Sequence, residues 1–170
     1  MFSRPNWQFL LALALENAAI LAIFERNPAE VDRLASELIE LSTRHNFVYW
    51  LAIGSIFCGW ARSASGDTAE GFPCIERGIR DFRANSSTLA VPFWLALTAE
   101  ALHVAHRTSE ALEAINEAEA LVARTEERCW LAELHRLRGV FLAAMVPTRP
   151  KLRLRSVKPL KPQGSRSRFR

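Results

Sequence analysis

Apolar residues recur at the three- and four-residue intervals of an amphipathic α-helix over most of this chain, and no stretch alternates with the period of a β-strand. The pattern predicts an all-α protein, with helices over residues 5–26, 28–45, 48–65, 68–84, 88–105, 109–125 and 128–145. It is clearest in the sixth helix, whose apolar stripe is Ala111, Leu112, Ile115, Ala118 and Val122.

Helix-boundary residues support this division of the chain. Asn27 precedes Pro28 as an N-cap before a proline at the first helical position, and Asp67 is an N-cap forty residues later. Gly66 fits the left-handed turn that ends the preceding helix. Pro73 lies about six positions into the fourth helix, where it lacks an amide donor, so we expect a kink or a later start there.

Small residues recur every forty positions within the apolar stretches, and further small residues follow them by twelve and nineteen positions. Small side chains let two helix backbones approach closely, so the spacing predicts stacked antiparallel helical hairpins, which form an α-solenoid. We expect Gly139 to be such a packing residue rather than a helix stop. The predicted packing residues are Ala19, Gly59, Ala99, Gly139, Gly71, Ala111, Gly78 and Ala118.

The repeat fails after residue 145, which predicts a helical-repeat domain over 1–145 and a separate tail over 146–170. Residues 1–145 carry a net charge of −5, whereas the tail carries nine basic residues and no acid. The repeat would place packing residues at Lys151 and Lys158, so we expect a disordered tail. Out-of-frame translation is one explanation; the other is a basic arm that binds nucleic acid or other anions by counterion release.

Residues 9–24 are almost wholly apolar, with Glu16 and Asn17 at their centre. An acid in the middle of a membrane helix is costly and the segment is short, so we expect a buried helix, with a membrane anchor as the alternative. Cys58, Cys74 and Cys129 stand far apart and suggest no disulfide framework, which favours the cytoplasm.

Three stretches together resemble a known family. They are "FVYWLAIGSIFCGWARSASGDTAEGFPCIERGIRDFRA" (47–84), "LALTAEAL" (95–102) and "ERCWLAELHRLRG" (127–139). They are similar to the C-terminal tetratricopeptide-like (TPR-like) region of bacterial signalling ATPases in which an adenylate/guanylate cyclase domain precedes the ATPase module. The standard TPR period is 34 rather than 40, and no phosphate-binding loop of the GxxxxGK[ST] type is present.

The resemblance implies a detached fragment that acts as a protein–protein or interdomain scaffold in signal transduction, without enzymatic activity or a cofactor. Its partner would be a protein or an adjacent domain of the ATPase, and exposed solenoid ends would favour self-association. Tryptophans on the first helix of each hairpin are candidate anchors for such a partner, or they fill the core between repeats. The candidate partner-binding residues are Trp50, Trp60, Trp94, Trp130, Arg136 and Arg138.

Other chemistry has few candidates. His103 and His106 lie three apart and could share a metal, but no third ligand is evident. His135 stands beside acidic and basic neighbours and could serve in acid–base chemistry, but a helix surface explains it equally. Cys58 precedes a packing glycine and is expected to be an inert thiol.

Overall fold

The computed structural model describes residues 7–85 and 89–146, and this part of the chain is all-helical, without a β-strand. Of the predicted tail over 146–170, residues 147–170 lie outside the described residues. The described residues form seven α-helices and one 3₁₀ turn: α1 (Trp7–Phe24), α2 (Pro28–His45), α3 (Val48–Ala64), α4 (Thr68–Ala84), α5 (Val91–Val104), α6 (Thr108–Thr125), η1 (Arg128–Trp130) and α7 (Leu131–Met145).

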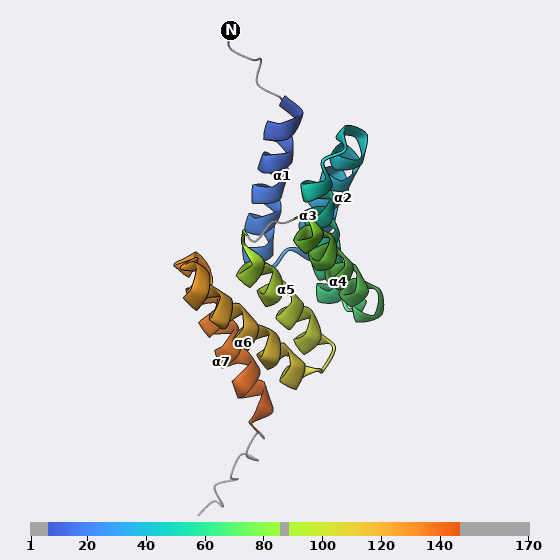
Figure 1. Ribbon diagram of the computed structural model, residues 1–170. Helices are drawn as coiled ribbons and strands as arrows, with labels where there is room; N and C mark the ends of the chain where they lie inside the picture. Colours follow the sequence, from blue (N-terminus) through green and yellow to red (C-terminus); the bar gives the residue numbers. More distant parts are fainter. Residues whose placement is uncertain (1–6, 86–88, 147–170) are drawn as a thin grey trace, which may run out of the picture.

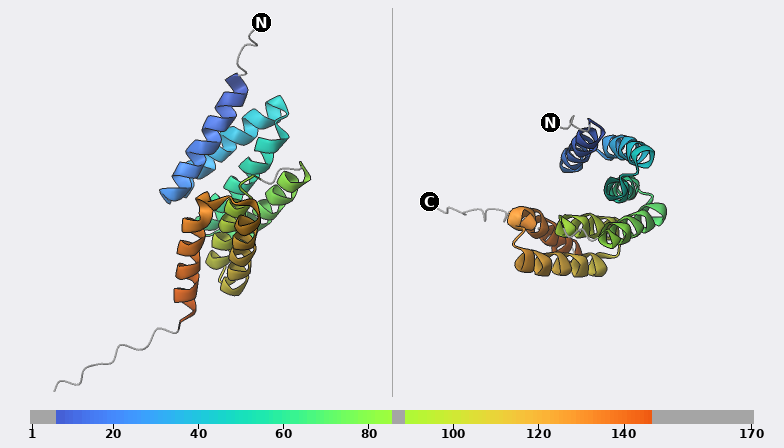
Figure 2. Two further views of the ribbon diagram at one scale, coloured as in Figure 1. Left: turned by 60° about the vertical axis from the view of Figure 1, so that its left-hand side comes forward. Right: turned by 45° about the horizontal axis from the view of Figure 1, so that its top comes forward.

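The helices pack in a row in chain order, from α1 at one end to α7 at the other (Figure 1). Each helix contacts the next one in the sequence. The odd-numbered helices also contact each other directly, α1 with α3, α3 with α5, and α5 with α7. The row of helices curves into an open arc, which is visible in the right-hand view of Figure 2. Side chains of neighbouring odd-numbered helices can therefore combine into one surface.

The predicted helix boundaries have clear local causes. The side-chain oxygens of Asn27 and Asp67 accept hydrogen bonds from backbone amides three residues later, at 3.2 and 3.3 Å. Gly66 has a φ of +101°, the left-handed conformation that glycine adopts without a steric cost. Because the Asp67 cap fixes the start of α4 at Thr68, the expectation of a later start at Pro73 is wrong.

Left-handed residues mark most of the other helix ends. Positive φ angles occur at six described residues. One of them, Ala90, precedes α5, and the other five are separated by multiples of twenty residues: Arg26, Asn46, Gly66, His106 and Glu126. Asn tolerates this conformation, whereas the other non-glycine residues adopt it at a cost of about 1–2 kcal/mol. The tight turns therefore depend on helix packing as well as on local preference.

Two glycines bring α3 and α4 into backbone contact. A Cβ added to Gly59 would lie 2.6 Å from the carbonyl oxygen of Gly71, and a Cβ added to Gly71 would lie 2.6 Å from the carbonyl oxygen of Gly59. Gly78 meets α3 in the same way, with a Cβ placed 2.8 Å from the carbonyl oxygen of Ala52. The predicted packing alanines are wholly buried: Ala19, Ala99, Ala111 and Ala118.

Gly139 differs from this prediction. It lies on the exposed surface of α7, and a Cβ added to it would meet no atom within 4 Å. The physical reason is the position of α7 at the end of the row. Gly59 packs against Gly71, which lies twelve residues later in the chain. The equivalent partner of Gly139 would be residue 151, which lies outside the described residues. Within the described chain, no helix packs on this face of α7.

Helix α1 is less buried than the sequence predicts. One face packs against α2 and α3 through five core residues: Ala12, Leu15, Ala19, Ala22 and Ile23. The opposite face leaves large apolar side chains exposed, among them Leu10 and Leu21. By length and composition α1 could span a membrane, a test that core helices of soluble proteins also pass.

Candidate interaction surfaces

Three of the four candidate tryptophans fill the core. Trp50, Trp60 and Trp94 expose only 6%, 3% and 1% of their surface. Trp94 packs edge-on against Phe57 and Phe82, with ring centroids 5.7 and 5.8 Å apart. Neighbouring helices cover most of each ring, which favours the alternative that these tryptophans fill the core, although Trp50 also lines a groove described below.

Trp130 and the two candidate arginines are more accessible, but each has partners within the chain. The ring of Trp130 is partly buried and stacks on Phe93, with centroids 4.4 Å apart. Arg138 donates to both carboxylate oxygens of Glu119 on α6, at 3.0 and 2.7 Å. This ion pair links α7 to α6, so the Arg138 guanidinium group stabilises the fold and is already occupied by a partner within the chain.

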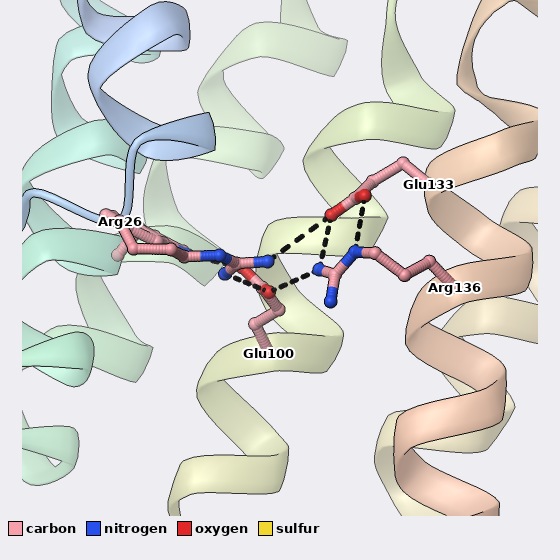
Figure 3. A network of polar contacts seen from close by, with 5 residues as sticks. Arg26, Glu100, Glu133 and Arg136 are labelled. Carbon is pink, nitrogen blue, oxygen red and sulfur yellow. Dashed lines mark hydrogen bonds and ion pairs between the residues drawn. The ribbon is translucent and has the colours of Figure 1, made fainter.

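The other candidate arginine belongs to a network on the odd-numbered helices (Figure 3). Arg136 donates to both carboxylate oxygens of Glu133, each at 2.7 Å, and its Nη2 lies 3.4 Å from Oε1 of Glu100 on α5. Arg26, just after α1, pairs with the same Oε1 and lies 3.5 Å from Glu133. The Trp60 indole donates to the second oxygen, Oε2 of Glu100, at 2.8 Å. One carboxylate thus joins α3, α5, α7 and the end of α1.

Replacing Glu100 with alanine should lower the free energy of unfolding by about 1–2 kcal/mol, because it leaves the Trp60 N–H without its acceptor and two guanidinium groups beside each other. Urea denaturation measures this loss. Glu37, whose exposed side chain pairs with Arg33 within α2, is the matched control, and Glu37→Ala should change the value by less than about 0.5 kcal/mol. Equal effects of the two variants would contradict a linking role for Glu100.

A second surface of the odd-numbered helices is a groove of about 590 Å³ between α1 and α3. Apolar and aromatic side chains form most of its wall, together with Glu16 and Asn17 from the middle of α1. The Trp50 indole donates to Oε2 of Glu16 at 2.8 Å. The groove lining is Phe9, Leu13, Glu16, Asn17, Tyr49, Trp50 and Leu89.

Two titratable groups in this groove are perturbed. Burial raises the pKa of Glu16 above its ordinary value, and the hydrogen bond from Trp50 opposes that shift. Burial and the nearby charge of Glu16 raise the pKa of Tyr49 to about 12. Among the described residues no ion pair reaches Glu16, so its charge is only partly compensated. Sequence reasoning used Glu16 only as evidence against a membrane span, although a lone acid in an apolar helix is itself a signal.

The exposed face of α1 can be compared with the other odd-numbered helices. Ala14, Asn17 and Leu21 are exposed on α1, and Leu21 exposes 64% of its surface. The residues 40, 80 and 120 positions later are all buried: Gly54, Phe57, Ala61, Trp94, Leu97, Ala101, Leu134, Leu137 and Phe141. Those positions face preceding helices, as Gly54 faces Ile39 of α2 and Trp94 faces Phe57 of α3. Helix α1 therefore exposes the face that its counterparts bury.

His103, His135 and Cys58 make ordinary contacts within the chain. Nδ1 of His103 lies 3.1 Å from the Thr108 hydroxyl, and His135 lies 3.4 Å from Glu119. Burial raises the pKa of the Cys58 thiol, which lowers its reactivity at neutral pH. Residues 7–85 and 89–146 contain no group of three His, Cys, Asp or Glu side chains placed to hold a metal ion.

Comparison with known proteins gives one distant similarity. Uncharacterized protein R02095 of Rhizobium meliloti (strain 1021) is 26% identical over 132 residues. The matched region is 78% of this chain and 13% of the relative, so the chain spans only a small part of the relative's length. No protein-family model and no solved structure matches the chain. The relative's name gives no activity, and the similarity transfers none.

Proposed function

We propose that this chain is a non-enzymatic helical-repeat scaffold that binds a protein or an adjacent domain through the exposed face of α1. The observation that carries the proposal is the exposure of Ala14, Asn17 and Leu21 at positions that the other odd-numbered helices bury. An uncharged and largely apolar face at the end of a helical row needs a polar cap or a partner. Surface burial, without covalent chemistry, is the mechanism.

We further propose that the helices form hairpins of a TPR-like solenoid. A repeat of forty residues, built as hairpins in a TPR-like solenoid, is supported by left-handed residues separated by multiples of twenty and by the Gly59–Gly71 contact. By the resemblance of its sequence, the chain corresponds to the regulatory repeat region of a bacterial cyclase-type signalling ATPase in the cytoplasm. The length of the R. meliloti relative is compatible with a region that functions beside other domains.

Site-specific photo-crosslinking tests this function. A photoreactive phenylalanine analogue replaces Leu21 in the full chain, and the same analogue replaces Glu40 on the exposed side of α2 as a matched control. After irradiation in bacterial cells, we expect a discrete protein adduct from position 21 and none from position 40. Mass spectrometry then shows whether the adduct contains another protein or a second copy of the chain.

A second substitution checks that the face itself makes the contact. Ala14 lies on the same exposed face, two helical turns before Leu21, and Ala14→Arg places a charge there without disturbing the core. This variant should abolish the adduct from position 21. Equal adducts from positions 21 and 40, or adducts with lipid alone, would overturn the proposal; lipid adducts would favour the membrane alternative.

A further inference from the structure

Two tryptophan–carboxylate pairs in this fold share their chemistry but differ in their surroundings. Both indoles belong to α3: Trp60 donates to Oε2 of Glu100 on α5, and Trp50 donates to Oε2 of Glu16 on α1, each at 2.8 Å. In the first pair, Oε1 of Glu100 binds the guanidinium groups of Arg26 and Arg136. In the second pair, no described basic residue reaches Glu16.

The surroundings of Glu16 suit the same kind of cation. The carboxylate opens into the groove between α1 and α3, where Phe9, Tyr49 and Trp50 supply aromatic rings. Phe9 and Trp50 meet edge-on with centroids 4.6 Å apart, and Tyr49 and Trp50 with centroids 5.5 Å apart. A planar guanidinium group pairs with carboxylates and stacks on aromatic faces, whereas its aliphatic stem suits an apolar wall.

We propose that the groove between α1 and α3 binds an arginine side chain of the partner protein, with its guanidinium group on Glu16 and its stem against the aromatic wall. This inference rests on the proposed scaffold function and specifies its partner's chemistry. An ion pair with a partly buried carboxylate contributes more binding free energy than apolar contact alone. The reason is that a cation beside Glu16 compensates a charge that folding leaves desolvated. The lysine side chain is a poorer fit, because it cannot bind in a planar, two-point manner.

Peptide titration tests the proposal on the full chain. The probe is acetyl-Leu-Arg-Leu-amide, and the neutral peptide acetyl-Leu-Gln-Leu-amide is its control. The reporter is the Trp50 indole N–H signal in a ¹H–¹⁵N NMR spectrum, assigned by its loss in Trp50→Phe. We expect a saturable shift with the arginine peptide and at least about tenfold weaker binding of the glutamine peptide.

Substitutions in the protein separate the carboxylate from the groove. Glu16→Gln keeps an oxygen that can accept from Trp50, so the fold should persist while arginine-peptide affinity falls about tenfold. Leu11→Ala is the matched control, because Leu11 is 50% exposed on α1 but does not line the groove, and it should leave affinity unchanged. Equal binding of both peptides, or no effect of Glu16→Gln, would overturn the inference.

A variant with an arginine introduced into the groove gives an independent readout if the peptide binds too weakly to measure. Leu13 lines the groove three residues before Glu16, so an arginine there can reach the carboxylate. Leu13→Arg should melt at a higher temperature than Leu13→Gln; equal melting temperatures, together with no peptide binding, would exclude an arginine site. If adducts from position 21 persist in that case, the proposed scaffold function is still supported and only the arginine site is excluded.

Discussion

Alanine at Gly59 should destabilise the protein by about 2–3 kcal/mol, whereas alanine at Gly139 should stabilise it by up to about 1 kcal/mol. Both residues lie within helices, 80 positions apart, so the gain in helix propensity is the same. The added methyl group at Gly59 would lie 2.6 Å from the Gly71 carbonyl oxygen and 2.8 Å from the Ile75 nitrogen. Since these are backbone atoms, α3 and α4 must separate. At Gly139 the methyl group meets nothing within 4 Å.

Urea unfolding, followed by circular dichroism on the full chain, measures both changes. Gly71→Ala is a second test of the same contact, because its Cβ would lie 2.6 Å from the Gly59 carbonyl oxygen. It should destabilise the protein by an amount similar to that of Gly59→Ala. A stabilising effect at Gly59 would show that α3 and α4 are farther apart in solution than in this structure. A large loss at Gly139 would show that a further helix packs on α7 in solution.

Alanine at Trp94 should cost about 3–5 kcal/mol of unfolding free energy, the typical loss for a large aromatic residue in a core. The Trp94 ring is 1% exposed and contacts Phe57, Phe82 and Phe93 from three different helices. Had the ring lain on a partner-binding surface, the same substitution would change stability by less than about 0.5 kcal/mol. Thermal and urea denaturation therefore decide between the two roles that its sequence position allows.

Two further variants sharpen that measurement. Trp7 is 71% exposed, so Trp7→Ala should leave stability nearly unchanged and serves as the matched control. The Trp94 indole nitrogen has no hydrogen-bond partner among the described residues. Trp94→Phe removes this buried donor and keeps most of the ring packing, so it should cost less than half as much as Trp94→Ala. A Trp94→Phe loss as large as that of Trp94→Ala would indicate a hydrogen bond that forms in solution.

The amino-acid sequence by itself determined the helical class and most helix boundaries, because these depend on local chemistry. Apolar spacing at three and four residues selects helix, and Asn27, Gly66 and Asp67 fix helix ends by side-chain capping or by backbone freedom. The predicted bounds of α2 and α4 agree with the structure. Small residues at spacings of twelve and forty also indicated where α3 and α4 meet, as Gly59 and Gly71 show.

Only the tertiary structure decided which apolar and charged residues are accessible, because burial depends on whether a neighbouring helix is present. Gly59 and Gly139 are equivalent in the sequence pattern, yet α4 covers one and no described helix covers the other. In the same way, Trp94 is enclosed by its neighbours, whereas Leu21 at the end of the row is open. Charge compensation is equally non-local: Glu100 gains Arg26 from 74 residues away, and Glu16 gains no cation within the described chain.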